Sequence, residues 1–315
     1  MNRILAAAAA CLVAGSAFAI DNVKILVPAN PGGGWDQTGR ALAAAMQSAK
    51  LVKSARIDNR GGAGGTIGIA QFVNSAKGDP DAIMVGGLVM VGAIELNKSP
   101  VTMAQVTPLA RLTAEYEVIV VPGGSKHRTL KDLLDAFKAN PGSVAWGGGS
   151  AGGVDHILVG LLAKEIGANA AKINYIPYAG GGEAVAAILG GHVAAGVSGY
   201  GEFQPHIKSG KMRALAVSSA SRLREAPDVP TIKEQGVNVE VFNWRGVFGA
   251  PGITDAQRNE LTKLIVATVK SSSWQETLKK NDWSDVLQTG DAFKGYIESE
   301  SKRVGGILKE IGLAK

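Results

Sequence analysis

Residues 27–36 read Val-Pro-Ala-Asn-Pro-Gly-Gly-Gly-Trp-Asp, and residues 59–65 read Asn-Arg-Gly-Gly-Ala-Gly-Gly. Each glycine cluster follows a short hydrophobic run, residues 23–27 and 55–57 respectively, and each precedes a helical pattern. A strand that ends in glycine and continues as a helix places backbone N–H groups at the N-terminus of that helix. Such groups attract anions, because they carry the positive end of the helix dipole.

Two further loops of the same composition occur later in the chain. Residues 146–152 read Trp-Gly-Gly-Gly-Ser-Ala-Gly, and residues 178–183 read Tyr-Ala-Gly-Gly-Gly-Glu. Four such loops in one chain predict a cleft that holds a carboxylated or phosphorylated small molecule.

The first nineteen residues have the features of a secretory signal peptide. A short basic start is followed by the apolar residues 4–14, and Ala17-Phe18-Ala19 fits a cleavage site with small residues. We expect cleavage after Ala19 and an exported mature protein; the alternative is a first buried helix. The only cysteine, Cys11, lies in this segment, so the mature chain would have no thiol for a disulfide, a nucleophile or a metal.

The composition indicates a globular protein of one large or two ordinary domains. The 315 residues include 33 Lys and Arg against 27 Asp and Glu, a net charge of +6 that would help to attract an anion. The basic residues are scattered, without a stripe interleaved with aromatics, so no nucleic-acid partner is indicated. The four histidines have no metal-ligand spacing, and we expect neither a metal nor a cofactor.

Short hydrophobic runs alternate with helical patterns along the chain. Predicted strands span residues 23–27, 55–57, 83–86, 117–121, 144–146, 172–176, 193–197, 213–217 and 245–250. Predicted helices span residues 36–48, 68–75, 89–95, 129–139, 153–166, 183–189, 254–271 and 291–311, with N-caps at Thr129, Ser150 and Thr254. This alternation predicts an α/β fold in which each domain is a doubly wound, mainly parallel sheet.

We expect two domains. Residues 20–121 and 221–315 form a discontinuous domain 1, and residues 122–220 form an inserted domain 2, so that each domain contains two of the glycine loops. Ligands of such sheets bind at the carboxyl ends of the strands, and two facing domains form an interdomain cleft.

Two known sequence motifs, one of serine hydrolases and one of dinucleotide-binding proteins, fit this chain, but the partner residues that each motif needs are missing. Residues 148–152 fit the Gly-x-Ser-x-Gly elbow of serine hydrolases, which would make Ser150 a nucleophile. The last histidine is His206, however, and no acid lies clearly at a strand end between it and Ser150. Residues 147–152 also fit the dinucleotide pattern Gly-x-Gly-x-x-Gly, again without its acidic partner. A secreted serine hydrolase remains the alternative function.

Several single residues allow two interpretations. Arg245 follows Phe242-Asn243-Trp244, and an arginine in so apolar a segment needs an anion, either an internal carboxylate or the ligand. Trp35 and Tyr178 are walls of the cleft or core aromatics. His156 is expected to be a core histidine, and Arg60 either binds a carboxylate or lies in solvent. Asp36 and Arg40, four residues apart on a helix, predict an ion pair.

The order and spacing of these motifs resemble one family along essentially the whole mature chain. The chain resembles the periplasmic substrate-binding proteins of tripartite tricarboxylate transporters, the TctC or Bug family. The resemblance uses the four glycine loops together with Pro-His-Ile-Lys-Ser-Gly-Lys-Met-Arg-Ala-Leu-Ala-Val-Ser-Ser at 205–219 and Pro-Asp-Val-Pro-Thr at 227–231.

The resemblance implies a two-domain periplasmic binding protein of type II that closes on its ligand and catalyses nothing. It implies a small organic anion, either a di- or tricarboxylate or an aromatic carboxylate, and delivery to a membrane permease of one large and one small subunit. A ligand sensor for a membrane kinase is also possible, and we expect a monomer. The residues expected to bind the ligand are Asn30, Pro31, Gly32, Gly33, Gly34, Trp35, Gly64, Ser150, Tyr178 and Arg245.

One departure bears on the ligand. Relatives that bind amino dicarboxylates or amides keep an acidic residue after the strand near residue 197, and here residues 197–201 contain none. Glu202 would be a substitute, which leaves a ligand amine open. The tricarboxylate-binding branch is the one that Arg245, Gly180-Gly181-Gly182-Glu183 and the Trp35-Asp36 pair resemble more.

Overall fold

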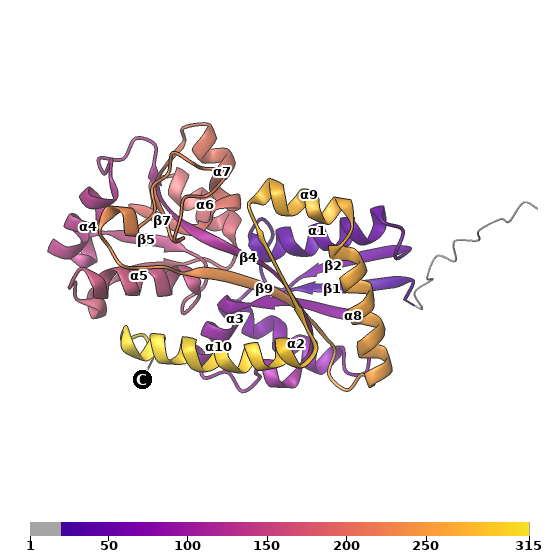
Figure 1. Cartoon of the computed structure of the whole chain (residues 1–315). Coiled ribbons are helices and arrows are strands. Elements are labelled where there is room, and N and C mark those ends of the chain that lie inside the picture. The colour runs from indigo at the N-terminus through magenta and orange to yellow at the C-terminus, as the bar shows by residue number, and fades with distance from the viewer. Residues whose placement is uncertain (1–19, 315) are drawn as a thin grey trace, which may run out of the picture.

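The computed structural model describes residues 20–314, and these residues form two α/β lobes (Figure 1). The predicted signal peptide therefore lies outside the described residues. Ten strands are described: β1 (Asn22–Val27), β2 (Ser54–Asn59), β3 (Ala82–Gly87), β4 (Thr107–Pro122), β5 (Ala145–Gly148), β6 (Asn174–Pro177), β7 (Ala195–Gly199), β8 (Met212–Val217), β9 (Phe242–Gly249) and β10 (Ser284–Thr289).

The helices surround both parts of the sheet. In the described residues the α-helices are α1 (Gly34–Ser48), α2 (Thr66–Ser75), α3 (Leu88–Asn97), α4 (Leu130–Ala139), α5 (Val154–Glu165), α6 (Gly181–Leu189), α7 (Tyr200–Lys208), α8 (Asp255–Val269), α9 (Ser272–Asn281) and α10 (Gly290–Glu310). In the first lobe, α1 and α9 lie on one face of the sheet and α3 and α10 on the other (Figure 1). In the second lobe, α5 lies on one face and α6 and α7 on the other.

The strand order is β2-β1-β3-β9-β4-β7-β5-β6, and β8 and β10 also pair with β4. The β4 strand joins the lobes, because residues Thr107–Tyr116 pair with β9 whereas Glu117–Pro122 pair with β7 or β8. The sequence analysis placed this strand only at residues 117–121. Its first part was missed because Arg111, Glu115 and other polar residues interrupt the apolar run.

The sheet is more mixed than the alternation predicted. The pairs β1-β2, β1-β3, β5-β6 and β5-β7 are parallel, whereas every pair that includes β4 or β9 is antiparallel. The adjacent strands β9 and β4 are antiparallel to each other, and each is also antiparallel to its outer neighbour, β3 or β7. The centre of the sheet is therefore antiparallel, and the parallel pairs lie toward its two ends.

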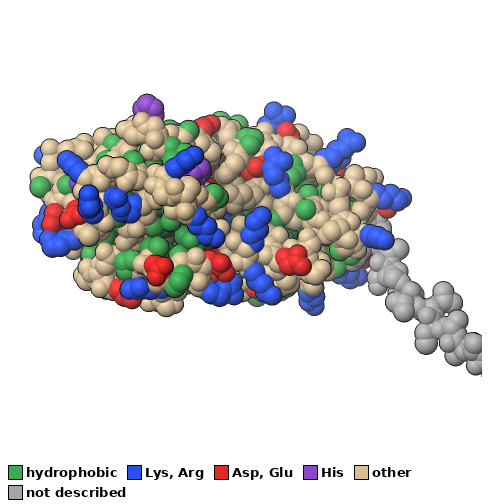
Figure 2. Space-filling view, turned by 90° about the horizontal axis from the view of Figure 1, so that it is seen from above, with side chains coloured by type: hydrophobic (Ala, Val, Ile, Leu, Met, Phe, Trp, Pro, Cys, Tyr) green, Lys and Arg blue, Asp and Glu red, His purple; other side chains and the backbone are tan. Residues whose placement is uncertain are grey.

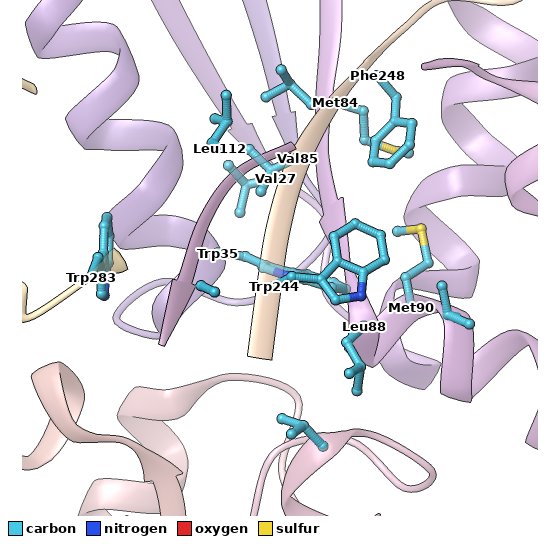
Figure 3. Packing of buried hydrophobic residues seen from close by; sticks show 14 of the residues in the cluster. Val27, Trp35, Met84, Val85, Leu88, Met90, Leu112, Trp244, Phe248 and Trp283 are labelled. Atoms are coloured by element: carbon cyan, nitrogen blue, oxygen red, sulfur yellow. The ribbon is translucent and has the colours of Figure 1, made fainter. Parts of the chain in front are cut away.

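The main core surrounds the buried strands β3 and β9 of the first lobe and continues into the second lobe through residues such as Phe137 and Trp146. Residues of β3 are all buried, as expected for a central strand covered on both faces. Figure 3 shows labelled members of this core, from Phe248 within the lobe to Trp244, Trp35 and Leu88 at the end nearest the second lobe. This cluster thus supports the edge at which the lobes meet, and a second, smaller cluster around Val118 and Phe203 packs the other lobe.

The helix caps confirm two predictions and correct one. Thr129 and Thr254 each accept a hydrogen bond from the third residue of their helices, within full capping boxes. The predicted cap at Ser150 is wrong, because α5 begins after Gly153 and Ser150 uses its carbonyl oxygen to accept the Gly153 N–H at 2.9 Å. The extra turn, Ser150–Gly153, separates the serine from the helix.

Three elements escaped prediction for identifiable reasons. Pro205 lies inside α7 and normally indicates the end of a helix. The α9 helix buries only Trp274 and Leu278, too few residues for an apolar stripe. The β10 strand has exposed or half-buried positions and pairs only along the edge of β4.

Candidate functional site

The two lobes touch directly through their glycine loops. The Asn30 N–H donates to the Ala179 carbonyl oxygen at 3.3 Å, and Asn30 Nδ2 donates to Glu183 Oε1 at 2.5 Å. The backbones of Gly33 and Gly181 approach so closely that a Cβ on Gly33 would lie 2.7 Å from the Gly181 nitrogen. The structure is therefore a closed form, in which glycine at position 33 permits the contact.

Behind this contact lies a cavity of about 70 Å³ between the lobes. Both lobes contribute to its wall, since the loop after β1, α1, α3 and β9 line it from one lobe and α5, α6, β7 and α7 from the other. Its lining residues are Pro28, Ala29, Gly33, Gly34, Trp35, Val89, Gly149, Ser150, Val154, Asp155, Tyr178, Ala179, Gly180, Gly181, Ser198, Glu202, Asn243 and Arg245.

The structure brings most of the expected site residues together. Six of them line the cavity: Gly33, Gly34, Trp35, Ser150, Tyr178 and Arg245. Asn30 lies at the contact between the lobes instead, while Pro31 and Gly32 are exposed outside the cavity.

Gly64 lines an adjoining hollow of about 200 Å³, which shares Ser150, Tyr178 and Ala179 with the main cavity. Its φ of +66° lies in the left-handed region, and a Cβ there would lie 3.3 Å from Ser150 Cβ. Glycine therefore lets the second loop turn against Ser150.

Some backbone N–H groups of the glycine loops already have an acceptor within the protein. In three of them a nearby carboxylate accepts a loop N–H: Asp36 from Gly32 at 3.0 Å, Asp155 from Gly149 at 2.6 Å, and Glu183 from Ala179 at 3.2 Å. Buried or half-buried amides need an acceptor, and each loop finds one in its own following helix. These three N–H groups are therefore already paired within the protein and are not free to bind an anion.

Asp36 also has the ion pair that its spacing predicted. Its Oδ2 lies 2.8 Å from Arg40 Nε, and its other oxygen accepts a hydrogen bond from Asn59. Burial opposes ionisation of Asp36, but the hydrogen bonds from Arg40, Gly32 and Asn59 outweigh it and keep its pKa below the usual value. Asp36 thus fixes the first loop rather than meeting a ligand.

His156 and Tyr175 hold the third loop in place. His156 stacks on Tyr175 with ring centroids 4.1 Å apart, and its Nδ1 accepts the Gly152 N–H. The Tyr175 hydroxyl donates to the Gly149 carbonyl oxygen at 2.8 Å. Burial lowers the pKa of His156 to about 4, so the ring is neutral near pH 7. His156 is a structural histidine, as its position in the sequence suggested.

Arg245 has an internal partner and also faces the cavity. Its Nη2 is ion-paired with Glu115, whose other oxygen accepts a hydrogen bond from Trp283 Nε1 at 2.8 Å. Arg245 is 1% exposed and lies over the Trp283 ring, 5.1 Å from its centroid. Its Nε and Nη1 have no hydrogen-bond partner among residues 20–314. Arg245 therefore lines the cavity and has two buried nitrogens whose N–H donors no acceptor in the described residues uses.

Three further carboxyl groups surround the cavity. Asp155 and Glu202 line it, and Glu117 lies behind them, fully buried. Burial raises the pKa of Asp155 to about 6, and burial together with the Asp155 charge raises the pKa of Glu202 to about 8. Burial, with the charges of Asp155 and Glu202 added, raises the pKa of Glu117 well above its usual value. The wall is thus rich in acid that is difficult to ionise.

These acids and Asn243 were not among the expected ligand-binding residues. A local signal existed for Glu115 and Glu117, which are charged residues two apart in a β-branched run and therefore share one strand face. Asp155 directly follows the third glycine loop. Glu202 was considered only as a substitute partner for a ligand amine, because the helix that positions it was not predicted.

The surface adds little to the site. Figure 2 shows Lys and Arg scattered over one face of the molecule rather than gathered into a stripe. Arg60 pairs with Asp58 at 3.1 Å, with both side chains about half exposed, which supports the solvated interpretation. Within residues 20–314, no group of three His, Cys, Asp or Glu side chains is placed to hold a metal ion. No described helix is both long and apolar enough to span a bilayer.

The comparisons with known proteins cover nearly the whole chain. A sequence profile described as "Tripartite tricarboxylate transporter family receptor" matches residues 39–313. Protein BugT of Bordetella pertussis is 31% identical over 325 residues, which cover 99% of this chain and 98% of BugT.

Solved structures share the fold. The periplasmic binding protein BugD superposes with a TM-score of 0.85 at 26% identity, covering 94% of this chain and 99% of BugD. MatC from Rhodopseudomonas palustris, solved with bound malate, superposes with a TM-score of 0.80 at 22% identity, covering 92% of this chain and all of MatC. The two-domain α/β fold expected from the sequence is confirmed by these matches.

Proposed function

This chain belongs to the tripartite tricarboxylate transporter receptor family, and we propose that it is a periplasmic solute-binding protein that captures an organic carboxylate between its lobes. The ligand classes we consider are di- and tricarboxylates and aromatic carboxylates. The protein with its bound carboxylate delivers this ligand to a membrane permease of one large and one small subunit. It does so as a monomer, without catalysis, after export by the N-terminal signal.

One observation carries this proposal: both lobes close over a cavity, and residues of its wall have buried hydrogen-bond donors without a protein acceptor among residues 20–314. Arg245 supplies Nε and Nη1, and Trp35 supplies Nε1, all without a hydrogen-bond partner in the described part of the chain. Unsatisfied buried donors are costly, and a ligand carboxylate would satisfy them. The malate bound in MatC is an example of a short dicarboxylate in a protein of this fold.

The size of the cavity favours a short ligand. An engineered protein cavity of about 150 Å³ accommodates benzene, whereas this cavity measures about 70 Å³. Four- or five-carbon acids therefore fit with a small separation of the lobes, and aromatic or tricarboxylic acids require a larger one.

Closure itself would provide the signal to the permease. We place the moving bodies at residues 20–121 with 221–315, and at 122–220, the boundaries inferred from the sequence. A ligand that binds both lobes favours the closed form, and a permease that recognises this form distinguishes loaded from empty protein. The same closed form would serve a membrane sensor kinase.

A thermal-shift screen of organic acids tests the function. A ligand that binds only the folded protein raises the melting temperature, so at least one carboxylate should do so at millimolar concentration. A sugar that raises the melting temperature while no carboxylate does would contradict the proposal. Labelling with a fluorophosphonate separates the hydrolase alternative, since only an activated Ser150 would form the adduct.

Ser150→Ala is the most direct test of the binding loop. We expect calorimetry to show carboxylate affinity reduced about tenfold, because one ligand hydrogen bond is lost. The denaturation midpoint should stay unchanged, since Ser150 caps no helix. Unchanged affinity would remove Ser150 from the site.

A further inference from the structure

The long helix α10 lies against both lobes, since it begins beneath the first lobe and ends below α5 of the second (Figure 1). Its first part packs on β9. Phe293 is fully buried, with its ring centroid 6.0 Å from that of Trp244, and Glu300 accepts a hydrogen bond from Trp244 Nε1 at 3.0 Å. Val304 extends this packing to α3, where a Cβ on Gly92 would lie 3.6 Å from Val304 Cγ1. As far as Val304, α10 therefore belongs to the first lobe.

The end of α10 packs on the second lobe instead. Ile311 is 2% exposed, and a Cβ on Gly160 of α5 would lie 2.5 Å from Ile311 Cδ1 and 3.2 Å from Ile311 Cβ. One turn further along α5, Lys164 forms an ion pair with Glu310. The missing side chain at Gly160 therefore lets the end of α10 lie directly on α5.

This contact is part of the packing of α5 in the second lobe. The helix is buried around most of its circumference, and β5 packs on only one side of it. A helix with apolar residues on every side needs cover on every side, and the end of α10 provides it at Gly160. The buried residues of α5 are Val154, Asp155, Ile157, Leu158, Val159, Gly160, Leu162 and Ala163.

The end of α10 has a regular helix stop that keeps it in place on α5. The Leu313 N–H donates to the Leu308 carbonyl oxygen at 2.8 Å, and the Gly312 N–H donates to the Lys309 carbonyl oxygen at 3.0 Å. Gly312 has a φ of +74°, so these bonds form a Schellman motif. The last turn of α10 is therefore anchored to the second lobe as one unit.

Two adjacent glycines separate the two anchored parts of α10. A Cβ on Gly306 would meet no atom within 4 Å, and a Cβ on Gly305 would meet only the Glu95 side chain, 3.4 Å away at its nearest atom. Packing therefore does not require glycine at either position, although glycine weakens the interior of a helix. Sharp bends in helices occur where such small residues are paired.

We propose, on the basis of the lobe closure proposed above, that α10 is a further connection between the lobes, which bends at Gly305-Gly306 when they separate. Residues 307–314 then move with the second lobe, although the sequence-based division assigns residues 221–315 to the first. In the closed structure α10 is one unbroken helix from Gly290 to Glu310. A bend disrupts its hydrogen bonds, so α10 limits how far the ligand-free lobes open.

Replacement of the glycine pair tests the bend. Small-angle scattering of the ligand-free protein should give a radius of gyration larger than that of the closed structure. We expect the double variant Gly305→Ala/Gly306→Ala to reduce this excess at least twofold, because alanine favours the straight helix. Gly295→Ala, in the part of α10 that packs on the first lobe, is the matched control and should leave the radius unchanged. Equal radii for the double variant and the unmodified protein would overturn the proposal.

A disulfide tests whether the end of α10 moves with the second lobe. The Cβ positions of residues 160 and 311 are 3.2 Å apart, close to the separation of about 3.5–4.5 Å in disulfides. For the double variant Gly160→Cys/Ile311→Cys, the oxidised and reduced forms should have the same radius without ligand. A smaller radius after oxidation would show that α10 leaves α5 on opening, which overturns the proposed bend. Circular dichroism checks the fold of every variant.

Failure of this inference can be distinguished from failure of the function. The scattering measurements need no ligand, whereas the thermal-shift screen tests carboxylate capture. If the unmodified ligand-free protein already has the radius of the closed structure, α10 has no opening to limit and the inference is overturned, while carboxylate capture stands. If no carboxylate binds but the glycine variant contracts as expected, the function falls and the bending of α10 stands.

Discussion

Arg245 and Glu115 are the most deeply buried ion pair among the described residues, and 130 positions separate them in the sequence. Burial lowers the pKa of Arg245 to about 9, which still leaves it charged at neutral pH. Trp283 and Asn243 complete the hydrogen bonds of Glu115. A buried pair of this kind adds little net stability, but the loss of one partner leaves an isolated charge.

Arg245→Met should therefore lower the free energy of unfolding by about 3–5 kcal/mol, because Glu115 would remain buried without its counter-charge. Urea denaturation at pH 7 measures the change. The control is Arg60→Met, which removes a half-exposed pair with Asp58 and should cost less than about 1 kcal/mol. Equal costs for the two variants would show that Glu115 does not depend on Arg245.

The raised pKa of Glu202 predicts that the free energy of unfolding decreases as the pH rises. Its pKa of about 8 in the folded protein lies above the ordinary value of 4.5, so the folded state retains a proton that the unfolded state loses. The free energy of unfolding therefore falls as the pH rises from 4.5 to 8, and the full loss is reached above pH 8.

Glu202→Gln should remove this loss. Without ligand, the variant should match the unmodified protein near pH 4.5 and exceed it by on the order of 5 kcal/mol at pH 8.5. Chemical denaturation across this range measures the difference. A constant difference between the two proteins at every pH would contradict the assignment.

The glycine loops act together with the helices that follow them. Each of α1, α5 and α6 begins next to the cavity and contributes a carboxylate that holds its own loop, namely Asp36, Asp155 or Glu183. The positions of these loops were readable from composition, because glycine after a strand and before a helix is a local pattern. The carboxylates that fill part of each loop were not, because an acid in a first helical turn equally suits the helix dipole.

Gly33→Ala should separate the lobes without disturbing either one. The φ of Gly33 is −94°, which alanine adopts without strain, yet its Cβ would lie 2.7 Å from the Gly181 nitrogen. We expect ligand affinity to fall tenfold or more while the free energy of unfolding changes by less than about 1 kcal/mol.

Gly295→Ala is the control for this variant. Gly295 lies within α10 and its Cβ would meet open space, so alanine should stabilise the protein by about 0.5–1 kcal/mol and leave affinity unchanged. If Gly33→Ala binds ligand as well as Gly295→Ala does, the contact between α1 and α6 does not limit closure.

The lobes are joined where β4 passes from one part of the sheet to the other and where the chain returns from β8 to β9 (Figure 1). Ser218 ties the two passages together: its N–H donates to the Glu117 carbonyl oxygen at 2.9 Å, and its hydroxyl donates to the Val241 carbonyl oxygen at 2.5 Å. The acids that surround the cavity therefore lie next to the connection about which the lobes would move.

Small-angle scattering tests this view of the whole protein. Addition of a binding acid should reduce the radius of gyration of the free protein toward that of the closed structure, since ligand binding favours the closed form. Asn30→Ala removes the hydrogen bond to Glu183 and should weaken, but not abolish, the contraction. A radius unchanged by saturating ligand would exclude closure as the response.

The chain carries in its local patterns the alternation of strands and helices, the caps at Thr129 and Thr254, and the places where the backbone turns through glycine. These features depend on residues within a few positions of one another, through hydrogen bonds and side-chain periodicity. The charge balance of the cavity, in contrast, depends on residues that lie far apart in the sequence. Arg245 meets Glu115, and Glu117, Asp155 and Glu202 converge, only because two lobes pack and close. Such pairings depend on which distant segments come into contact, and periodicity contains no information about that.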